Sequence, residues 1–347
     1  MKINESFSSK IIFSNKPENQ LKPINFITKK NTNIYYNKIL FCITLLIIFI
    51  IFIEIKKIHI VNRFNIYINN NQNFDIHFNY EEYEKDIITN KIKIYSGWEL
   101  TEKEAYFING IIRKNHLKKC LEIGVSNGGS SILILNSIKN IKNSFLVSLD
   151  LNTQLYKDRT KKTGYRVDKY FPELKNKWKL YTGDQPHKFL VNLNIKFDFL
   201  FLDTKHRAPG ELINFIEALP FLNENAIVVV HDLLWHIYMS SKLGKKIFPS
   251  CISLFPAING EKALLGYSNS IITNIGAVYL NSHQEKYYIN YFLLLLNFWD
   301  YMPNDNQIND LRIFIKNYYK KDIYLNIFEK AVFYNKKIFD RLNLNNI

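Results

Sequence analysis

The sequence predicts an α/β protein built on a doubly wound, mainly parallel sheet, and three observations lead to that fold class. Apolar segments of strand length alternate with helical segments, an order that places helices on both faces of a sheet. A glycine-rich turn joins the first strand to the next helix, and a polar residue follows almost every strand. The predicted strands lie at residues 120–123, 144–149, 178–182, 197–202 and 226–230.

The stretch Lys118–Ser131, KKCLEIGVSNGGSS, organises the predicted sheet. It contains a buried strand, a turn with Gly124 and Gly128, and a helix start at Ser130. Glycines let the backbone pass close to a ligand, and the helix start presents unpaired N–H groups. The stretch therefore predicts a nucleotide or cofactor cradle. Glu122 lies in an otherwise apolar strand, so we expect it to have a polar partner.

Further elements flank this core. Thr101 and Glu104 match a capping box ahead of an apolar stripe, which predicts a helix beginning at Thr101. A final strand pair is expected at residues 262–267 and 275–280. Residues 283–342 predict helices with aromatic and leucine stripes, which indicate packing within the fold or self-association into a homo-oligomer.

The N-terminal part predicts a membrane anchor. Residues 39–53 contain no charged residue and are flanked by lysines, which is typical of a membrane-spanning helix. A single-pass membrane localisation is therefore expected. The expected order is a polar basic tail at 1–38, the transmembrane helix at 39–55, a connector at 56–95, the α/β domain at 96–282 and a C-terminal helical extension at 283–347.

Composition limits the classes of partner. The chain has 347 residues, of which 47% are hydrophobic, and its formal net charge is +15. The lysines are spread along the whole chain rather than gathered in one patch, so no nucleic-acid partner is expected. The three cysteines form no C-x-x-C pair and no disulfide framework, which favours a reducing compartment.

Polar residues at the strand ends predict the chemistry, because ligands of open parallel sheets bind at the carboxyl ends of the strands. Asp150 ends the second strand, where a carboxylate can bind ribose hydroxyls. Asp203 and Asp232 end strands expected side by side, so both could bind one divalent cation. His206 follows closely and suits a general base, while His231 is expected next to the metal.

These motifs carry a resemblance to a known family. In chain order they are LEIGVSNGGSS, VSLD, YTGD, FLFLDTKH and IVVVHD. Together they resemble class I S-adenosylmethionine-dependent methyltransferases, which have a Rossmann-like fold. The most similar groups are the cephalosporin hydroxylase-like and rhamnosyl O-methyltransferase proteins and the metal-dependent macrolide-sugar O-methyltransferases. The resemblance covers residues 95–280.

The resemblance implies a role for each matching residue. The implied cofactor-binding residues are Glu122, Gly124, Ser126 and Gly128 for the methionine moiety, Asp150 for the ribose and Asp184 beside the adenine. The implied Mg²⁺ ligands are Asp203 and Asp232, and the implied catalytic base is His206. One position departs from the family, because the sugar methyltransferases have Glu-Asp where this chain has His231-Asp232. That change removes one anionic ligand and leaves open whether Mg²⁺ is required.

The expected function is therefore methyl transfer from S-adenosylmethionine to a hydroxyl of a small-molecule or saccharide acceptor, such as a glycan or glycolipid. The catalytic domain is expected in the cytoplasm, where that cofactor is made.

Three other functions stay open at this point. Gly124–Gly128 spells G-x-S-x-G, which would make Ser126 a hydrolase nucleophile, with Asp203 as orienting residue and His231 as base. Few elements precede this turn, however, whereas hydrolases place several strands there. Tyr165–Lys169 spells Y-x-x-x-K of nicotinamide oxidoreductases, but it follows the second strand, which is too early. The third is a non-catalytic, membrane-anchored protein that binds the cofactor.

Overall fold

The computed structural model describes residues 100–236, 251–265 and 274–342. All of them belong to one compact unit, Asn73–Ile347. The predicted polar tail, transmembrane helix and connector at residues 1–95 lie outside the described residues.

A seven-stranded mixed sheet forms the centre of this unit, in the order β5-β2-β1-β6-β7-β9-β8. β1, β2, β5, β6 and β7 are parallel to one another, and β9 is antiparallel to both β7 and β8. The strand order reverses between β1 and β6, which makes the carboxyl ends of these strands the expected ligand crevice. The strands are β1 (Lys119–Ile123), β2 (Phe145–Asp150), β5 (Trp178–Thr182), β6 (Phe197–Leu202), β7 (Leu222–Val230), β8 (Gly260–Leu264) and β9 (Gly276–Leu280). The predicted mainly parallel sheet is confirmed.

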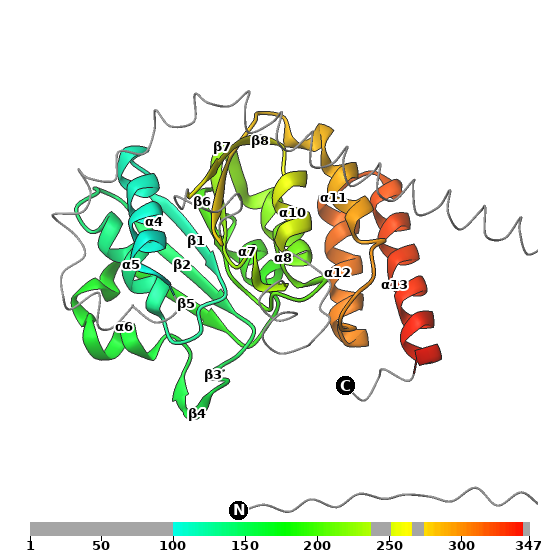
Figure 1. Ribbon diagram of the computed structural model, residues 1–347, viewed down its shortest axis with the longest axis horizontal. Coiled ribbons are helices and arrows are strands. Elements are labelled where there is room, and N and C mark those ends of the chain that lie inside the picture. Colours follow the sequence, from blue (N-terminus) through cyan, green and yellow to red (C-terminus); the bar gives the residue numbers. More distant parts are fainter. Residues whose placement is uncertain (1–99, 237–250, 266–273, 343–347) are drawn as a thin grey trace, which may run out of the picture. The chain divides into compact units, whose positions relative to one another are not determined.

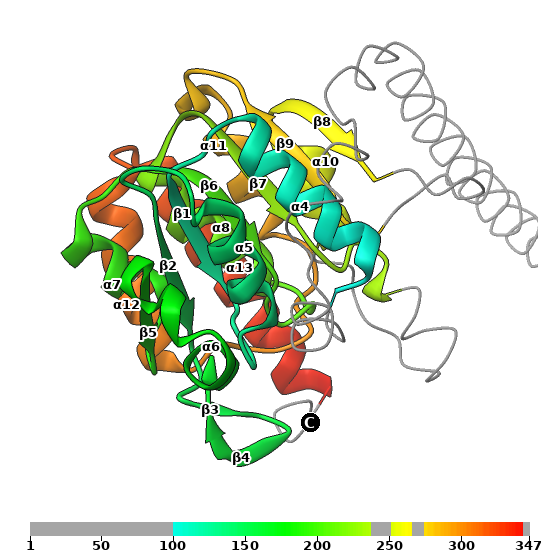
Figure 2. The ribbon, with the colours of Figure 1, turned by 90° about the vertical axis from the view of Figure 1, so that its left-hand side faces the viewer.

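Helices cover both faces of this sheet (Figures 1 and 2). Alternate residues of the strands pack into two hydrophobic cores, one on each face of the sheet, as the two-residue period of a strand requires. On β6, Phe199 and Phe201 pack in one core, while Leu200 and Leu202 pack in the other. The first core contains α4 (Glu102–Lys114), α5 (Gly129–Ile138) and α6 (Tyr165–Tyr170). The second contains α7 (Pro186–Leu193), α8 (Gly210–Ala218), α10 (Cys251–Ala257), α11 (Tyr288–Leu294), α12 (Asp305–Tyr318) and α13 (Asp322–Leu342).

The first described helix begins as the sequence predicts. The hydroxyl of Thr101 accepts a hydrogen bond from the Glu104 N–H at 3.3 Å, and the Glu104 carboxylate accepts one from the Thr101 N–H at 2.7 Å. This capping box satisfies donors that a helix start otherwise leaves unpaired. It also fixes Glu104 in the first turn of α4, where its second oxygen is available to the strand ends.

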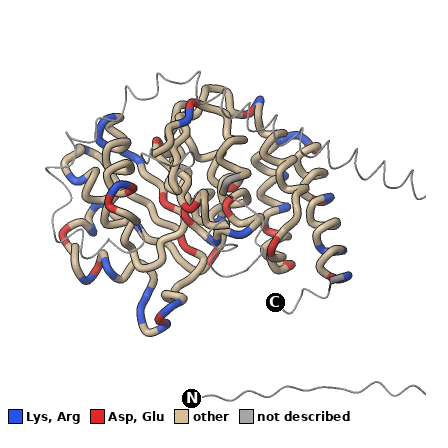
Figure 3. Tube along the Cα trace, in the orientation of Figure 1, with Lys and Arg blue, Asp and Glu red and all other residues tan. Residues whose placement is uncertain are grey.

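A small hairpin between β2 and α6 is absent from the sequence prediction. It consists of β3 (Gln154–Leu155) and β4 (Asp158–Lys162). Most of β4 is exposed and charged, so it lacks the apolar alternation by which strands are recognised. Figure 3 shows basic residues on this hairpin and on helices at both ends of the molecule, in agreement with a dispersed charge.

The C-terminal helices complete the second core. The aromatic side chains of Tyr291, Phe292, Trp299, Phe314 and Phe328 are buried there. The Tyr319 hydroxyl donates to the backbone carbonyl of Ile216 in α8 at 2.6 Å. The predicted stripes therefore pack within the fold, while the homo-oligomer stays a prediction.

The predicted single-pass membrane localisation requires correction. Among the described residues, no helix is long and apolar enough to cross a membrane. The longest, α13, has 21 residues, but charged side chains such as Glu329, Lys330 and Lys337 interrupt it. The segment 39–55, on which the prediction depended, lies outside the described residues.

Candidate active site

The strand register places the predicted site residues side by side at the carboxyl edge of the sheet. Ile123 of β1 pairs with Leu202 of β6, and Leu202 pairs with Val230 of β7. The next residues, Gly124, Asp203 and His231, therefore leave the sheet side by side. This is the edge where the strand order reverses and where ligands of such sheets bind.

The glycine-rich turn is shaped by close backbone contacts. Gly124 has φ +93°, and a Cβ built on it would lie 1.8 Å from the carbonyl oxygen of Asp203. Gly128 has φ +94° and lies against Gly164, whose Cα would be 3.1 Å from a Cβ on Gly128. No larger residue fits these positions without moving backbone. The turn therefore depends on glycine for its conformation and for its packing.

Glu122 has the polar partners that its position requires. Its side chain is fully buried, and its carboxylate accepts hydrogen bonds of 2.5 Å each from the hydroxyls of Ser130, Ser131 and Ser148. Burial raises the pKa of Glu122 to about 7, although the three hydroxyls act in the opposite direction. Two of these serines open α5, so Glu122 ties β1 to the helix start. Its contact with a methionine moiety stays a prediction.

Asp150, at the end of β2, holds the glycine-rich turn. One carboxylate oxygen accepts hydrogen bonds from the N–H groups of Val125 at 2.9 Å and Ser126 at 3.1 Å. The other accepts one from Asn152 at 2.8 Å. A carboxylate offers about four acceptor positions, so capacity remains for a ribose hydroxyl. Asp150 is thus beside the cradle, as the sequence predicts, and its role in binding ribose stays a prediction.

Asp184 lies next to this position, beyond the end of β5. The intervening Gly183 donates its N–H to the backbone carbonyl of Asp150 at 3.0 Å. The Asp184 carboxylate accepts from the N–H of Gln185 at 2.8 Å and pairs with Lys188 at 3.1 Å. Burial opposes ionisation of Asp184, but the contacts with Gln185 and Lys188 together hold its pKa below the ordinary value. Its predicted place beside an adenine is untested.

The predicted metal and catalytic residues form one cluster at the ends of β6 and β7. The Nε2 atom of His206 lies 3.1 Å from a carboxylate oxygen of Asp232 and 3.5 Å from one of Asp203. One donor atom from each of these three side chains lies within 4.8 Å of the other two. His206 and Asp232 both have positive φ, at +55° and +54°, a backbone conformation that is uncommon for residues other than glycine. The sequence therefore predicted this grouping correctly.

His231 lies on the other side of the same two carboxylates. Its Nδ1 atom is 3.3 Å from Asp203 and 3.6 Å from Asp232, and its Nε2 atom is 3.5 Å from Glu104. Burial opposes the charged form, but Asp203, Glu104 and Asp232 raise the pKa of His231 well above its ordinary value. These three carboxylates therefore favour the protonated form of His231. Burial of Glu104 and Asp203 acts to raise their pKa values. The contacts with His231 outweigh burial and lower the pKa of Glu104 to about 2 and that of Asp203 below its usual range.

The balance of charge favours a cation at the open side of the cluster. The carboxylates of Glu104, Asp203 and Asp232 surround His231, which can carry at most one positive charge. Asp203 and Asp232 each direct one oxygen to His231 and the other to His206. The oxygens on the His206 side suit a hard divalent cation, which binds through one or two carboxylates and retains water. They also suit a positively charged sulfonium group.

The hydrolase interpretation lacks its catalytic pair. Both nitrogens of His231 face carboxylates, so neither is placed to take a proton from Ser126. Ser126 itself has φ +48°, and its carbonyl accepts from the N–H of Gly164 at 2.9 Å. The G-x-S-x-G pattern is therefore a property of the turn that packs against Gly164.

A match to a protein-family model covers most residues of this site. Residues 121–233 match the family model described as a methyltransferase domain. The matched segment contains the glycine-rich turn, Asp150, Asp203 and His206, and it ends just past Asp232. The class predicted from the sequence, an S-adenosylmethionine-dependent methyltransferase of class I and therefore an enzyme, is confirmed for this segment. A search of the curated proteins found no match.

Three solved structures similar to this chain are two O-methyltransferases and a methyltransferase. One from Bacillus cereus in complex with SAH has 14% identity and TM-score 0.43, covering 59% of this chain and 99% of its own. TomG from Streptomyces achromogenes, involved in tomaymycin synthesis and in complex with SAM, has 14% identity and TM-score 0.39, covering 57% and 91%. SAH-bound PaMTH1 from Podospora anserina has 15% identity and TM-score 0.42, covering 57% and 91%. At TM-scores this low, no residue role or ligand is transferred to this chain.

Three residues of the cluster escaped the sequence analysis. The sequence analysis recognised Glu104 only as part of the capping box of α4, yet its carboxylate contacts His231. Asn274, just before β9, donates to Asp232 at 2.9 Å and to Glu104 at 3.3 Å. Glu211, near the start of α8, accepts from the N–H of His206 and lies 3.5 Å from its Nδ1 atom. Glu211 carried only a weak signal, because its helical stretch is mainly apolar but also contains Asn214 and Glu217.

Proposed function

We propose that this enzyme transfers the methyl group of S-adenosylmethionine to a hydroxyl of a glycan, glycolipid or related small molecule. The observation that carries the proposal is the convergence of His206, Asp203 and Asp232 beside the glycine-rich turn. A sulfonium methyl is already electrophilic, so the protein must mainly align the acceptor and receive its proton.

The chemical step needs only a base in the correct place. The acceptor oxygen attacks the methyl carbon, and the C–S bonding pair returns to sulfur. The hydroxyl proton passes to Nε2 of His206, the ring nitrogen on the side of Asp203 and Asp232. Glu211 lies on the Nδ1 side of the ring, at 3.5 Å, and favours the orientation in which Nε2 faces the acceptor. The products are a methyl ether and S-adenosylhomocysteine.

Mg²⁺ fits the same cluster. Asp203 and Asp232 would hold it, since each has an oxygen on the open side of the site. When bound, the ion would lower the pKa of the acceptor hydroxyl. His231 stands where the sugar methyltransferases that the sequence resembles have a carboxylate, so this cluster would hold the ion with one anionic ligand fewer.

The test compares His206→Ala with His283→Ala in the full chain. His283 follows β9, and its side chain is 57% exposed. Calorimetry should show that both variants bind S-adenosylhomocysteine like the wild type. Methyl transfer to a pool of hydroxylated acceptors, followed by mass spectrometry, should fall about 10²- to 10⁴-fold in His206→Ala only. Unchanged transfer in His206→Ala, or a wild type that does not bind the nucleoside, would refute the proposal.

A further inference from the structure

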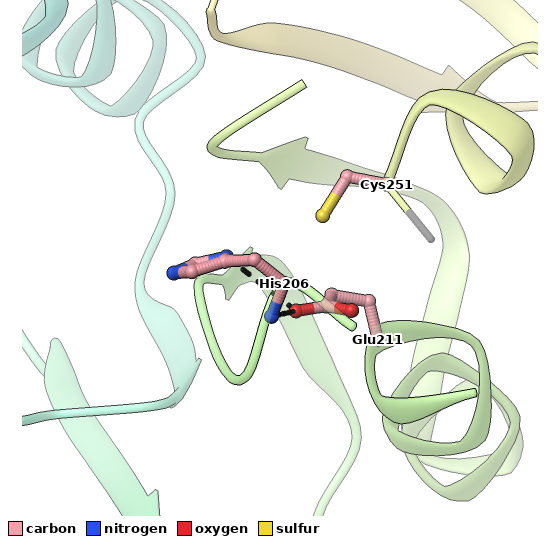
Figure 4. Close-up of side chains that lie close together, drawn as sticks. All are labelled: His206, Glu211 and Cys251. Carbon is pink, nitrogen blue, oxygen red and sulfur yellow. Dashed lines mark hydrogen bonds and ion pairs between the residues drawn. The ribbon is translucent and has the colours of Figure 1, made fainter. Parts of the chain in front are cut away.

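A second group of donor atoms lies on the far side of His206. The Nδ1 atom of His206, a carboxylate oxygen of Glu211 and Sγ of Cys251 all lie within 4.8 Å of one another. Figure 4 shows these side chains converging from the loop after β6, the start of α8 and the start of α10. This group uses the imidazole nitrogen that does not face Asp203 and Asp232.

Two polar atoms of these side chains are buried without a hydrogen-bond partner. They are Nδ1 of His206 and the Oε2 atom of Glu211. Glu211 has no exposed surface, and Cys251 is only 3% exposed. A buried polar atom without a partner is costly, and an ion is one of the few explanations for several such atoms together. One cation at the centre of the group would satisfy all three side chains.

The donor types identify the cation. Imidazole nitrogen, thiolate sulfur and carboxylate oxygen are the ligands of Zn²⁺, whereas sulfur is a poor ligand for Mg²⁺. Ligand atoms of a tetrahedral zinc ion lie about 3–4 Å apart, so a small contraction of this group would suffice. Burial, followed by neighbouring carboxylates including Glu211, raises the pKa of the Cys251 thiol well above its ordinary value. Zinc binding would therefore displace a thiol proton.

We propose that His206, Glu211 and Cys251 form a Zn²⁺ site, with a water molecule as the fourth ligand. The ion would join the loop after β6 to α8 and α10, and so fix the wall of the site beside His206. The proposal bears on the proposed function, because an ion on Nδ1 of His206 would leave the ring proton on Nε2. The zinc-bound form could then not accept the acceptor's proton, so zinc would inhibit methyl transfer.

The test is Co²⁺ titration of the full chain after metal extraction. Co²⁺ replaces Zn²⁺ and gives a near-ultraviolet charge-transfer band when sulfur is a ligand. We expect stoichiometric binding with this band in the wild type and loss of the band in Cys251→Ser. The matched control is Cys120→Ser, since Cys120 is also a buried free cysteine but lies in β1. Cys42→Ser covers the remaining cysteine.

A second measurement keeps the test decisive if Cys251→Ser folds poorly. Glu211→Gln should weaken Co²⁺ affinity at least tenfold, and Zn²⁺ should raise the unfolding temperature of the wild type but not of Glu211→Gln. A band that persists in Cys251→Ser, or a wild type without stoichiometric metal, would overturn the proposal. The thiol would then simply donate its proton to Glu211. Binding of S-adenosylhomocysteine, measured in parallel, reports on the proposed function independently.

Discussion

The Asp203 carbonyl oxygen lies 1.8 Å from the position that a Cβ on Gly124 would occupy. The end of β6 therefore fits against the glycine-rich turn only because Gly124 has no side chain. We expect Gly124→Ala to force the two backbones apart and to abolish binding of S-adenosylhomocysteine in calorimetry. The free energy of unfolding should fall by more than the 1–2 kcal/mol, roughly, that a positive φ costs alone.

Gly183→Ala separates backbone strain from the clash. Gly183 has φ +94°, close to the +93° of Gly124, but its added methyl would meet only a side-chain carbon of Thr153 at 3.1 Å. Urea unfolding should show a loss of about 1–2 kcal/mol for this variant. Equal losses in both variants would show that contact with Asp203 is unimportant.

Asp150 gives a prediction about cofactor affinity. Its carboxylate fixes two N–H groups of the glycine-rich turn, so the turn and the expected ribose contact depend on the same side chain. Asp150→Asn keeps the shape but removes the charge. A hydrogen bond to a charged group contributes about 1.5–3 kcal/mol, so the dissociation constant for S-adenosylhomocysteine should rise about 10- to 100-fold in calorimetry. Asp158→Asn, in the exposed β3–β4 hairpin, should leave it unchanged.

The fold was largely predictable because its signals are local. Strands of a parallel sheet that is covered on both faces are continuous apolar runs. β5 and β6 begin and end at the residues predicted from the sequence. The β3–β4 hairpin was missed because exposed charged strands have no apolar pattern. Asp203 and Asp232 could be grouped from sequence because a parallel sheet aligns the ends of its strands.

The rest of the site depends on contacts between distant segments. Glu104 reaches His231 from a helix that precedes β1, and Asn274 reaches Asp232 from the start of β9. No short motif encodes such contacts. The raised pKa of His231 was equally hidden, since it depends on carboxylates from three different parts of the chain.

Glu122 should make stability depend on pH. Its pKa in the folded protein is about 7, raised by burial from 4.5. The folded state therefore binds more protons than the unfolded state between these values, and the free energy of unfolding falls as pH rises through this window. The loss for Glu122 should be about 3 kcal/mol. Gln cannot ionise, so the stability of the wild type relative to Glu122→Gln should decrease from about pH 5 to pH 8 in urea unfolding. A pH-independent difference would contradict a raised pKa at Glu122.

The last prediction concerns a buried pair away from the candidate site. Nδ1 of His187 in α7 lies 2.6 Å from a carboxylate oxygen of Glu217 in α8, and both side chains are buried. Burial raises the pKa of Glu217, while His187 opposes that rise. His187→Ala would leave the carboxylate buried without its partner, which costs about 3–5 kcal/mol in comparable cases.

Lys188→Ala is the matched control, because Lys188 is adjacent and pairs with Asp184 and Asp310 at the surface. Such exposed pairs contribute about 0–1 kcal/mol, so thermal unfolding should barely change. In His187→Ala the carboxyl of Glu217 can avoid its charge by keeping its proton. The cost of the substitution should therefore be smaller at acidic pH than at pH 8, because a raised pKa in the folded state penalises only the ionised form. A cost equal to that of Lys188→Ala at every pH would mean that water reaches Glu217 and that α7 and α8 are held together by apolar contacts alone.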